Sequence, residues 1–541
     1  MKILAYNPGH DGAIAYIRDA KLVFSIEAEK DSHYRNSSLS VPHILDALGQ
    51  IGEMPDVICR GGWWPSDHHE YLFGSLHNSG YRGVERELSI VQRGRFFQGR
   101  THYFSSTHER SHVLCALGMS GFVPENTVYV LVWEGGIGAF YEVDPDFNVT
   151  LVGEVMDQPG NRYGLLYGLA DPTFSKDEPY PRLSDAGKLM ALASFSTRDE
   201  PSDAERKLLS FLLDGPSRKL SDYDGLENAP HLNVGLSDPE FRNFAGIYSD
   251  AIFDRFYRFA VEKMKSGRPL IIAGGCGLNC DWNSQWQKTG FFSNVFVTPV
   301  ANDSGSAIGT AIDAQLHFTG SPTIEWTVYS GLPFDHRGQI DKSQYDIRDF
   351  DSSEIASLLA NDLILAWANG NYEIGPRALG NRSILAAPFK ERTRVRLNEI
   401  KNREQYRPIA PLCLQEDAHR WFGCDHHSPH MLFTYRATTD ALAAVTHVNG
   451  TARLQTVTRS SNSAIYDLLT AFKASTGYGV LCNTSLNFHG KGFINNLSDL
   501  DTYVTHHNLD GFVLEGKTYL LKASTTYQAF LRSAANAARD Q

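Results

Sequence analysis

The sequence predicts an α/β protein whose N-terminal part contains the same arrangement of strands twice. In residues 2–29 an apolar strand leads into a glycine loop, and two further strands follow with a turn at Arg18-Asp19 between them. Residues 128–155 repeat this order, with the last turn at Asp144-Pro145-Asp146. Short apolar runs bounded by Gly, Asp and Pro are typical of strands and turns. The repeat indicates a duplicated fold whose two glycine loops face one cleft; two hairpins that match by chance are the alternative.

Helices are expected between and after these strands. Residues 42–52 and 108–119 have helical spacing of apolar side chains. Residues 160–245 are rich in charge, Gly and Pro, which indicates helices and loops inserted over the cleft. Residues 269–283 predict a buried strand, a glycine turn and the start of a helix, and residues 294–314 predict a strand, a polar turn and a helix of small residues.

The composition of the chain changes near residues 345–355. The segment "DIRDFDSSEIASLLANDLILAWANG" predicts a linker, an amphipathic helix and a strand. We therefore place a domain boundary at about residue 350, which divides the chain into residues 1–350 and 351–541. The second part has strands of its own and many arginines.

Composition and charge exclude several classes of function. Of the 541 residues, 42% are apolar and 21% are charged, as in globular proteins. The net charge of −12 argues against a broad nucleic-acid-binding surface. The apolar runs are too short for a signal peptide or a membrane span, and the seven scattered cysteines form no C-x-x-C pair. We expect a cytoplasmic protein with reduced thiols and no membrane partner.

The stretch "HERSH" contains the pattern H-E-x-x-H at His108 and His112. Residues four apart share one face of a helix, so both imidazoles can reach one ion. Glu134 and Asp303 each follow a strand, where the cleft of a duplicated fold would lie. Two histidines with two carboxylates suit Fe(II), Zn or Mn, and the ligand types alone do not choose between these metals.

The same pattern is the signature of zinc peptidases, in which Glu109 would be the catalytic base. Against a peptidase, Glu134 ends a strand and opens the loop "EGGIG", where Gly135 and Gly136 favour phosphate binding. His10, in the first glycine loop, is a candidate general base, because a neutral imidazole accepts a hydroxyl proton near pH 7. A turn histidine bonded to backbone is the alternative for His10.

Further polar groups lie in loops that suit a nucleotide. In "GGCGLN", Gly274 and Gly275 allow close approach of the backbone to a ligand, and Asn279 can bond a ribose or base. The C-terminal part places arginines in turns rich in Gly, Pro and Asn, which a solvated helix face would avoid. Guanidinium groups bind phosphate and carboxylate oxygens in pairs. The candidate anion-binding groups there are Arg377, Arg382, Arg396, Lys401, Arg403, Arg407, Arg453, Asn483 and Ser485.

Three other features have less specific patterns. The runs "DHHE" (67–70) and "DHHSPH" (425–430) favour solvated or pocket-lining histidines over metal clusters. The pair Trp63-Trp64 could line an apolar acceptor pocket, although core packing is the usual role of such a pair.

Eight motifs together resemble one family, the O-carbamoyltransferases of antibiotic and nodulation-factor biosynthesis. They are "NPGHDG", "HERSH", "GGCGLNC", "NDSGSAIGTA", "EIGPRALGNRSILAAP", "REQYRPIAP", "THVNGTARLQTV" and "CNTSLNFHG". The resemblance covers essentially the whole chain, and the run 373–383 is the most diagnostic part. The opening "AYNPGHDGAIA…SIEAEKDS" is most similar to the branch that acts on cephem and ansamycin or other macrolide acceptors.

The resemblance implies a fold and a two-step reaction. Residues 1–350 would form an actin/Hsp70/sugar-kinase-like domain similar to tRNA threonylcarbamoyl transferases. Residues 351–541 would form an α/β domain similar to threonylcarbamoyl-adenylate synthases. The second domain would convert ATP, as its Mg²⁺ complex, and carbamoyl phosphate to carbamoyl adenylate. The first would transfer the carbamoyl group to a hydroxyl of a small antibiotic-type acceptor, in antibiotic biosynthesis.

The resemblance also assigns individual residues. The metal ligands of the family, with iron as the expected ion, fall on His108, His112 and Asp303. A fourth ligand, an aspartate in many relatives, falls on Glu134, and the transfer histidine falls on His10. The expected nucleotide or carbamoyl-phosphate contacts are Gly135, Gly136, Gly274, Gly275, Asn279, Asn302, Arg377, Arg382, Lys401, Arg403, Arg407, Arg453, Asn483 and Ser485.

Two other enzymes remain as alternatives at this point. A zinc metallopeptidase would need Glu109 as its base and would give the C-terminal arginines no role. A small-molecule kinase with an actin-like fold would need Mg²⁺ and no paired histidines. A nucleotide-binding module without catalysis is a third class. The acceptor alcohol, the resident metal and the oligomeric state do not follow from the sequence.

Overall fold

The computed structural model describes residues 1–63, 77–96, 98–122, 127–215 and 219–539. Trp64 and the run 67–70 lie outside these residues. The chain forms two compact units. The first consists of Met1–Asn7 and Pro55–Ile324, and the second consists of Pro8–Met54 and Glu325–Gln541. The predicted boundary near residue 350 stays a prediction.

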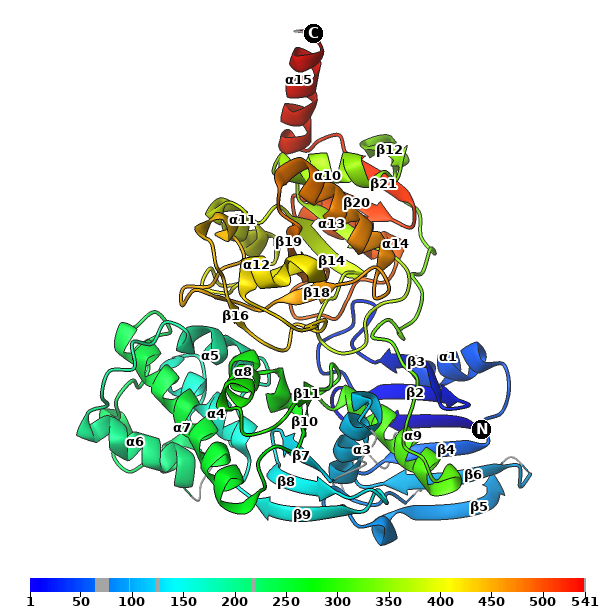
Figure 1. Cartoon of the computed structure of the whole chain (residues 1–541), viewed down its shortest axis with the longest axis vertical. Coiled ribbons are helices and arrows are strands. Elements are labelled where there is room, and N and C mark those ends of the chain that lie inside the picture. The colour runs from blue at the N-terminus through cyan, green and yellow to red at the C-terminus, as the bar shows by residue number, and fades with distance from the viewer. Residues whose placement is uncertain (64–76, 97, 123–126, 216–218, 540–541) are drawn as a thin grey trace. The chain divides into compact units, whose positions relative to one another are not determined.

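A five-stranded sheet with the order β11-β10-β7-β8-β9 lies in the first unit (Figure 1). Its strands are β7 (Val128–Trp133), β8 (Gly138–Val143), β9 (Val149–Glu154), β10 (Leu270–Ala273) and β11 (Val295–Val297). The first three form the predicted antiparallel meander, and β10 pairs in parallel with β7 and β11. All six residues of β7 are buried, as expected for an apolar strand covered on both faces.

The other strands of this unit pair mostly in parallel. They are β1 (Lys2–Asn7), β4 (Val57–Gly61) and β6 (Thr101–Ser106), with β5 (Ile90–Phe96) antiparallel to β6. Helix α3 (His108–Ser120) follows β6, and α9 (Ser304–Thr319) follows β11. The two helices pack against each other; α9 contacts β1 and β4, and α3 contacts β7 and β10.

The order of elements along the chain confirms the predicted duplication. A strand, a two-stranded hairpin, helical segments and further strands lead to α3, and the same order from β7 leads to α9. The expected α/β class with a duplicated N-terminal part is therefore confirmed. The predicted helices at 42–52, 108–119 and 294–314 appear as α1 (Val41–Ile51), α3 and α9.

Close contact between α3 and α9 depends on small residues. A Cβ at Gly309 of α9 would lie 1.8 Å from the carbonyl oxygen of Ser111 in α3, which no side chain tolerates. The Ser111 and Thr310 hydroxyls lie 2.8 Å apart across the same contact. Arg110 of α3 forms a buried ion pair with Asp313 of α9, at 2.8 and 2.9 Å. The two helices are thus joined at a fixed distance and register.

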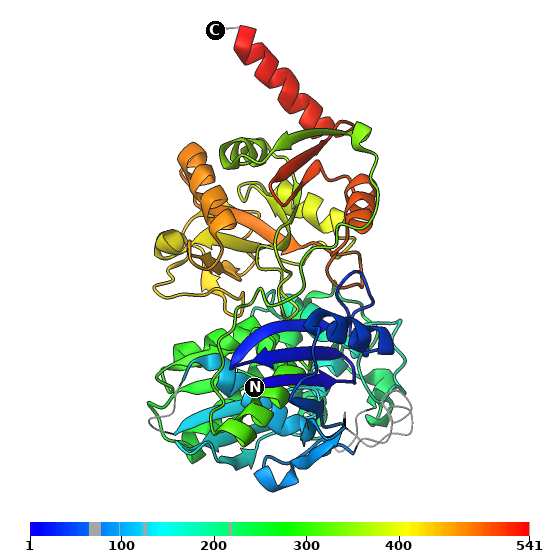
Figure 2. The same cartoon turned by 90° about the vertical axis from the view of Figure 1, so that its right-hand side faces the viewer.

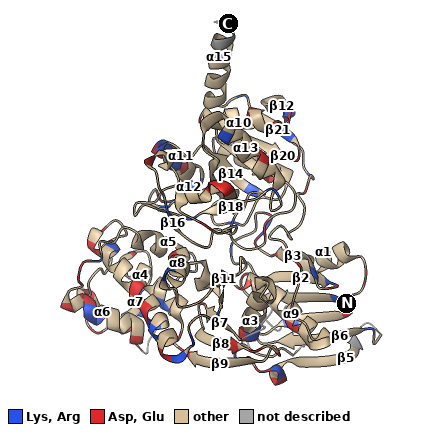
Figure 3. Ribbon diagram, in the orientation of Figure 1, with Lys and Arg blue, Asp and Glu red and all other residues tan. Residues whose placement is uncertain are grey.

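The segment predicted as helices and loops forms a helical layer beside the five-stranded sheet. Figure 3 shows that charged residues concentrate on these helices, while the strands are mostly uncharged. The helices are α4 (Pro159–Ala170), α5 (Asp185–Ala193), α6 (Asp203–Asp214) and α7 (Pro239–Lys263), followed by α8 (Cys280–Thr289). Short 3₁₀ turns occur at Arg86–Leu88, Leu220–Asp222, Leu226–Asn228 and Gly275–Leu278.

The second unit contains an eight-stranded mixed sheet with the order β12-β21-β20-β13-β14-β19-β15-β18. Successive residues of its central strands enter two different cores: Ala366 lies in one, and Leu365 and Trp367 lie in the other. This alternation follows from the two-residue period of a strand and shows that both faces are covered. The strands are β12 (Tyr345–Asp349), β13 (Leu365–Ala368), β14 (Arg382–Ala386), β15 (Ala410–Leu414), β18 (Gln455–Val457), β19 (Val480–Ser485), β20 (Gly511–Leu514) and β21 (Lys517–Leu521).

Further elements complete the second unit. The hairpin β2 (Ala13–Arg18) and β3 (Lys21–Glu27) belongs to it, as does the small sheet β16 (Tyr435–Arg436) and β17 (Thr451–Ala452). Figures 1 and 2 show α15 (Thr525–Arg539) running away from the eight-stranded sheet. The other helices are α10 (Ser352–Ala360), α11 (Glu391–Ile400), α12 (Ala418–Phe422), α13 (Ser463–Thr476) and α14 (Leu497–His506), with 3₁₀ turns at Lys342–Gln344, Gln415–Asp417 and Asp440–Leu442.

One predicted linker is wrong. Residues 345–349 form the edge strand β12, which pairs with β21. The charged residues that suggested a linker alternate with Tyr345 and Ile347, and Tyr345 is buried in a core of this unit. Charge is common on an edge strand, where it prevents pairing with another chain.

The seven cysteines are unbridged, and six of them are buried. Within the described residues, no helix is long and apolar enough to cross a membrane.

Candidate functional site

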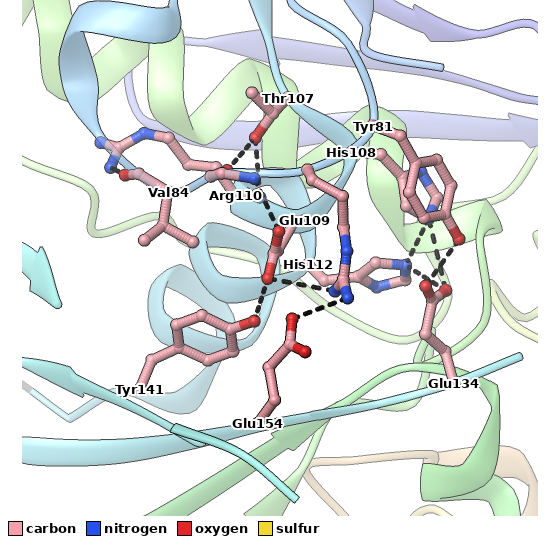
Figure 4. Close-up of polar contacts among 12 residues, drawn as sticks. Tyr81, Val84, Thr107, His108, Glu109, Arg110, His112, Glu134, Tyr141 and Glu154 are labelled. Carbon is pink, nitrogen blue, oxygen red and sulfur yellow. Dashed lines mark hydrogen bonds and ion pairs between the residues drawn. The ribbon is translucent and has the colours of Figure 1, made fainter. Parts of the chain in front are cut away.

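Four buried side chains from distant parts of the sequence meet in the first unit: His108, His112, Glu134 and Asp303. One ligand atom from each lies within 4.8 Å of the others. The two Nε2 atoms are 3.1 Å apart, and Glu134 Oε2 lies 3.3 Å from that of His108 and 3.4 Å from that of His112. Asp303 Oδ1 lies 3.8 and 3.4 Å from the same two nitrogens. The four residues predicted as metal ligands are therefore neighbours in space (Figure 4, which labels three of them).

The local sequence explains each position. Thr107 caps α3, because its hydroxyl accepts the N–H of Arg110, so the helix starts at His108. His112 lies one turn later on the same face. Glu134 follows the last residue of β7, and its N–H donates to Ile137 across the loop. Asp303 directly precedes α9.

This geometry fits one divalent ion. Imidazole nitrogens and carboxylate oxygens bind such ions at about 2.0–2.2 Å, so neighbouring ligand atoms lie about 3.0–3.4 Å apart at angles of 90–110°. Four of the five measured separations, 3.1–3.4 Å, match this spacing. Hydrogen bonds alone do not explain these short separations. Each imidazole Nε2 carries at most one hydrogen, yet it faces the other Nε2 and a carboxylate oxygen at once.

The electrostatics of the four residues favour positive charge at their centre. Burial works to lower the pKa of His112, but hydrogen bonds with Asp303 and Glu134 outweigh it and raise that pKa to about 10. Burial works to raise the pKa of Glu134, but His108 and His112 hold it well below its usual range. Glu134 thus acts as an anion toward the imidazoles, as it would toward a metal ion.

Further contacts with these four residues come from Trp63 and Tyr81, which the sequence interpretation did not assign to this site. The Tyr81 hydroxyl donates to Glu134 Oε1 at 2.7 Å, and its ring stacks on His108 with centroids 4.4 Å apart. Trp63 packs edge-on against His108 at 5.1 Å and is buried, as expected for core packing. Burial, with Glu134 and Asp303, raises the pKa of Tyr81, so its hydroxyl stays a donor. Tyr81 lies in an irregular loop with no periodic pattern that would have identified it.

Glu109 is directed to other partners (Figure 4). Its Oε2 accepts the N–H of Gly83 at 2.6 Å, and its Oε1 bonds the Tyr141 hydroxyl and lies 3.5 Å from Arg82. A peptidase base must instead reach a metal-bound water. Glu109 here fixes the loop that carries Tyr81, whose own carbonyl accepts the Glu109 N–H.

The glycine loop beside Glu134 is tightly packed on one side. A Cβ on Gly136 would lie 3.1 Å from the Tyr81 hydroxyl, and one on Gly135 would lie 3.4 Å from Asn161 Oδ1. Gly274 has φ +92°, and a Cβ there would meet the Trp133 carbonyl at 2.3 Å. Gly275, by contrast, has nothing within 4 Å of a Cβ position. Packing within the protein thus explains glycine at 136 and 274, and contact of these glycines with a ligand stays a prediction.

Two asparagines predicted to contact a nucleotide are partly engaged within the protein. The Asn279 Oδ1 caps α8 by accepting the N–H groups of Asp281 and Trp282, while its buried Nδ2 has no partner. The Asn302 Oδ1 accepts the Ser304 hydroxyl at 3.0 Å. The Asn279 amide is thus the better placed donor toward a ligand.

His10 lies in the second unit, in the glycine loop that follows β1. Its side chain is 44% exposed, and its Nδ1 lies 3.2 Å from Asp11 Oδ2. A carboxylate on one ring nitrogen fixes the orientation of the imidazole and increases its basicity. Asn36 holds Asp11 in turn, at 2.8 Å.

A cluster of cations in the second unit contains four of the predicted anion-binding residues: Lys401, Arg403, Arg407 and Arg453. Burial and the neighbouring Arg407 and Arg453 lower the pKa of Arg403 to about 9. Burial also lowers the pKa of Arg407, with Glu404 acting in the opposite direction. The buried Nε of Arg453 has no partner. Like charges held together in a buried place stabilise an anion that binds among them.

Lys401 also organises the loop around Ser485. Its ammonium donates to the carbonyls of Ser485 and Asn487 and to Asn487 Oδ1, at 2.5, 3.0 and 2.6 Å. Asn483 donates to Ala378 and Gln455, and its buried Oδ1 has no partner. Arg396 lies apart from this group and pairs with Asp510 at 3.0 Å.

Like Lys401, Arg382 uses its N–H donors within the protein. Nε and Nη2 bond Asn495 Oδ1 at 3.0 and 2.7 Å, and the remaining bonds go to carbonyls of the surrounding loop at Asn369, Gly370 and Asn381. Burial lowers its pKa to about 10. Arg382 therefore supports the loop from within. Arg377 lies earlier in the same loop.

The fold and the four-residue cluster define an α/β protein with a duplicated N-terminal part and a potential metal centre. Comparison with known proteins adds the family. Residues 356–521 match the family model described as the carbamoyltransferase C-terminus, and residues 250–312 match the carbamoyltransferase N-terminus. The chain is 46% identical to the 3'-hydroxymethylcephem-O-carbamoyltransferase of Amycolatopsis lactamdurans, over 97% of this chain and 100% of that protein.

Two further relatives and two solved structures are also similar to this chain. Identity is 45% to the protein of the same name from Streptomyces clavuligerus, over 96% of this chain and 99% of that one. It is 33% to nodulation protein U of Rhizobium tropici, over 91% and 92%. Among solved structures, full-length HypF in a phosphate- and nucleotide-bound form has a TM-score of 0.32 at 11% identity, over 60% of this chain and 56% of that one. An archaeal actin homologue has a TM-score of 0.27 at 12% identity, over 58% and 99%.

The chain belongs to the carbamoyltransferase family, and it is an enzyme of that class. The predicted resemblance is confirmed, including the branch that acts on cephem acceptors. The peptidase and kinase alternatives raised by the sequence therefore find no support.

Proposed function

We propose that this protein is an ATP-dependent O-carbamoyltransferase that carbamoylates the hydroxymethyl group of a cephem in antibiotic biosynthesis. The observation that carries the proposal is 46% identity, over the full length of the relative, to an enzyme named for this acceptor. The acceptor is a small molecule, with no nucleic acid or membrane involved, and the protein works in the cytoplasm.

The activating reaction takes place in the second unit. Carbamoyl phosphate reacts with water to give carbamate and phosphate. A carbamate oxygen then attacks the α-phosphorus of ATP, which enters with Mg²⁺, and pyrophosphate leaves. Negative charge grows on the phosphate oxygens, where Arg403, Arg407 and Arg453 offer guanidinium groups. The lowered pKa values of Arg403 and Arg407 support this role, because an anion bound beside them relieves the repulsion between the guanidinium groups.

The transfer reaction is the second step of the proposed mechanism. The acceptor oxygen attacks the carbamoyl carbon, AMP leaves, and His10 takes the proton from the hydroxyl. A divalent ion, with Fe(II) preferred and Zn(II) or Mn(II) also suited, would be held by His108, His112, Glu134 and Asp303 and would supply positive charge for polarising a carbonyl or screening a phosphate. In this proposal the Asn279 amide and the glycine loops at 135 and 275 bind the adenylate; the unpartnered Nδ2 of Asn279 supports this role.

Incubation with ATP, carbamoyl phosphate and a 3'-hydroxymethyl cephem tests the proposal. We expect pyrophosphate and phosphate release, and a carbamate ester identified by mass spectrometry. A matched cephem with a 3'-methyl group should support no product, because it lacks the nucleophile. If the protein releases no pyrophosphate and forms no ester with any hydroxylated antibiotic in a panel, the proposed function is wrong.

A further inference from the structure

A buried ion pair in the N-terminal part of the chain contacts the loop that the sequence analysis found most diagnostic. Glu27 ends β3, and Lys30 follows in the next turn. Lys30 Nζ lies 3.3 Å from Glu27 Oε2, and the two side chains are only 2% and 3% exposed. Lys30 also lies over the Phe493 ring at 3.9 Å. Residues 8–54 belong to the second unit, so this pair lies in the unit with the cation cluster.

The pair binds one residue of that loop, Gly375, on both sides. The Gly375 N–H donates to Glu27 Oε1 at 2.5 Å, and the Gly375 carbonyl accepts from Lys30 Nζ at 2.7 Å. Gly375 has φ +83°, which favours glycine. A carboxylate and an ammonium together thus fix two successive peptide groups, immediately before Pro376 and Arg377.

A second carboxylate fixes the other end of the same loop. Glu373 Oε1 accepts the N–H groups of Leu379, Asn381 and Arg382 at 2.6, 2.7 and 3.2 Å. Arg377 lies between these two anchor points. The residues between Gly375 and Leu379 are therefore held from both sides by buried charges.

The N-terminal segment also binds the loop that Lys401 organises. Ser32 donates to the Phe493 carbonyl at 3.0 Å, Gly492 donates to the His33 carbonyl at 2.9 Å, and Arg35 donates to the Gly490 carbonyl at 3.0 Å. A Cβ on Gly492 would lie 2.0 Å from the Glu29 carbonyl, so the two segments pack closely. Residues 27–35 thus contact the loops 373–382 and 485–493, which carry three of the predicted anion-binding residues: Arg377, Arg382 and Ser485.

We propose that Glu27 and Lys30 are positioning residues of the carbamoyl-activating site: they fix the peptide groups of Gly375 and so hold the loop 373–382 in the form that binds the anionic substrates. The inference rests on the proposed function in placing activation in this unit. A buried pair is not needed for stability as such, since apolar substitutes of similar volume are often tolerated. Its role is instead to orient the peptide groups of the loop at Gly375.

Three variants and one control test this role. Lys30→Met leaves Glu27 buried without its partner, so both the melting temperature and pyrophosphate release should fall. Glu27→Gln with Lys30→Met removes both charges, and the melting temperature should return toward that of the wild type. The third variant, Glu27→Gln alone, keeps a side-chain oxygen that can accept the Gly375 N–H. The control is Lys21→Met, on the same strand, where the ion pair with Glu325 is 60% and 73% exposed; it should behave as the wild type.

The double variant separates positioning from stability. We expect it to melt like the wild type and to retain its metal, yet to release pyrophosphate about 10- to 100-fold more slowly, because the Gly375 carbonyl has lost a charged donor. The Michaelis constants for ATP and carbamoyl phosphate should rise. Amide hydrogen exchange in a peptide covering 373–382 should be faster than in the wild type and in the Lys21→Met control.

Two results would overturn the assignment. Recovery of both stability and pyrophosphate release in the double variant would mean that the pair only stabilises the unit. Wild-type exchange of the 373–382 peptide in Lys30→Met would show that the loop does not depend on the pair. If the wild type itself released no pyrophosphate, the proposed function would fail, and amide exchange alone would then decide whether the pair fixes the loop.

Discussion

At the scale of single residues, the contacts of Glu109 decide how the H-E-x-x-H pattern is used. His108 and His112 face Glu134 and Asp303, whereas the carboxylate of Glu109 bonds Gly83 and Tyr141. The spacing of the two histidines follows from helical geometry, so the sequence could predict their meeting. The role of Glu109, which lies between the two histidines, depends on the loop at Gly83, 26 positions earlier. No local sequence pattern identifies that contact.

The first prediction concerns the metal ligands. His108→Ala or His112→Ala should remove bound metal and abolish carbamoyl transfer, because each change deletes one of two imidazole ligands. Metal content is measured by elemental analysis after purification in the presence of Fe(II), Zn(II) or Mn(II). Glu109→Gln is the matched control; it should keep the metal and most of the activity. An inactive Glu109→Gln enzyme with its metal intact would contradict this arrangement.

The second prediction concerns Tyr81. Tyr81→Phe keeps the ring stacked on His108 but removes the donor to Glu134 Oε1, so Glu134 should become less well oriented. Loss of such a partner typically costs about 10- to 100-fold in metal affinity. Competition with a chelator measures this without turnover. Tyr103→Phe is a suitable comparison, because its hydroxyl bonds the His77 carbonyl instead. Equal metal affinity in the two variants would exclude a role for the Tyr81 hydroxyl.

At the scale of secondary-structure elements, the packing of α3 on α9 sets the separation of the candidate ligands. His108 and His112 belong to α3, and Asp303 directly precedes α9. Glycine at position 309 lets the two backbones come together, and the ion pair of Arg110 with Asp313 fixes their register. A shift of one helix would move the histidines relative to Asp303.

The third prediction tests this packing. Gly309→Ala places a methyl group against the Ser111 carbonyl, so we expect a loss of about 1–3 kcal/mol in the free energy of unfolding and weaker metal binding. Gly187→Ala in α5 is the control, because nothing lies within 4 Å of its Cβ position. That change should be neutral or stabilise by about 0.5–1 kcal/mol, from helix propensity. Chemical denaturation and elemental analysis measure both effects. Unchanged metal binding in Gly309→Ala would show that the helices adjust independently of the ligands.

The sequence predicted these elements better than it predicted the details of their contacts. The two meanders, β10, α3 and α9 follow from strand and helix periodicity, which is local information. The edge strand β12 was missed because its charged residues also suit a linker. Arg382 was predicted to bind an anion because it lies among glycines, but its donors turn inward to Asn495 and nearby carbonyls. The direction of a long side chain is set by tertiary packing, which spacing along the chain does not reveal.

At the scale of the whole molecule, two half-reactions are assigned to groups far apart in sequence. In the proposed mechanism the cation cluster would serve adenylate formation, while His10 and the candidate metal ligands would serve transfer. The proposal therefore predicts that each half-reaction can be removed separately, which a single-step enzyme would not allow.

The fourth prediction uses this separation. His10→Asn should reduce carbamoylation of the acceptor by about 10²–10⁴-fold, because the base is lost while the hydrogen-bonding size is kept. It should still release pyrophosphate. Arg453→Ala should instead slow pyrophosphate release by roughly 10- to 100-fold, for the loss of one charge-assisted phosphate contact, and leave the metal in place. Single-turnover mass spectrometry follows the adenylate and the ester together. Loss of both half-reactions in His10→Asn would remove His10 as the transfer base.

The path of the chain between its units has a consequence for how such a gene could be divided or recombined. The chain passes from one unit to the other after Asn7, after Met54 and after Ile324. A single cut between two coding halves would leave residues 8–54, with Glu27, Lys30 and Arg35, attached to the wrong half. Exchange of acceptor specificity among relatives by one crossover would therefore separate the N-terminal segment from the loops it binds. Acceptor specificity in this architecture can instead change through substitutions within one intact gene, which keep these contacts. A designed chimaera would need three junctions.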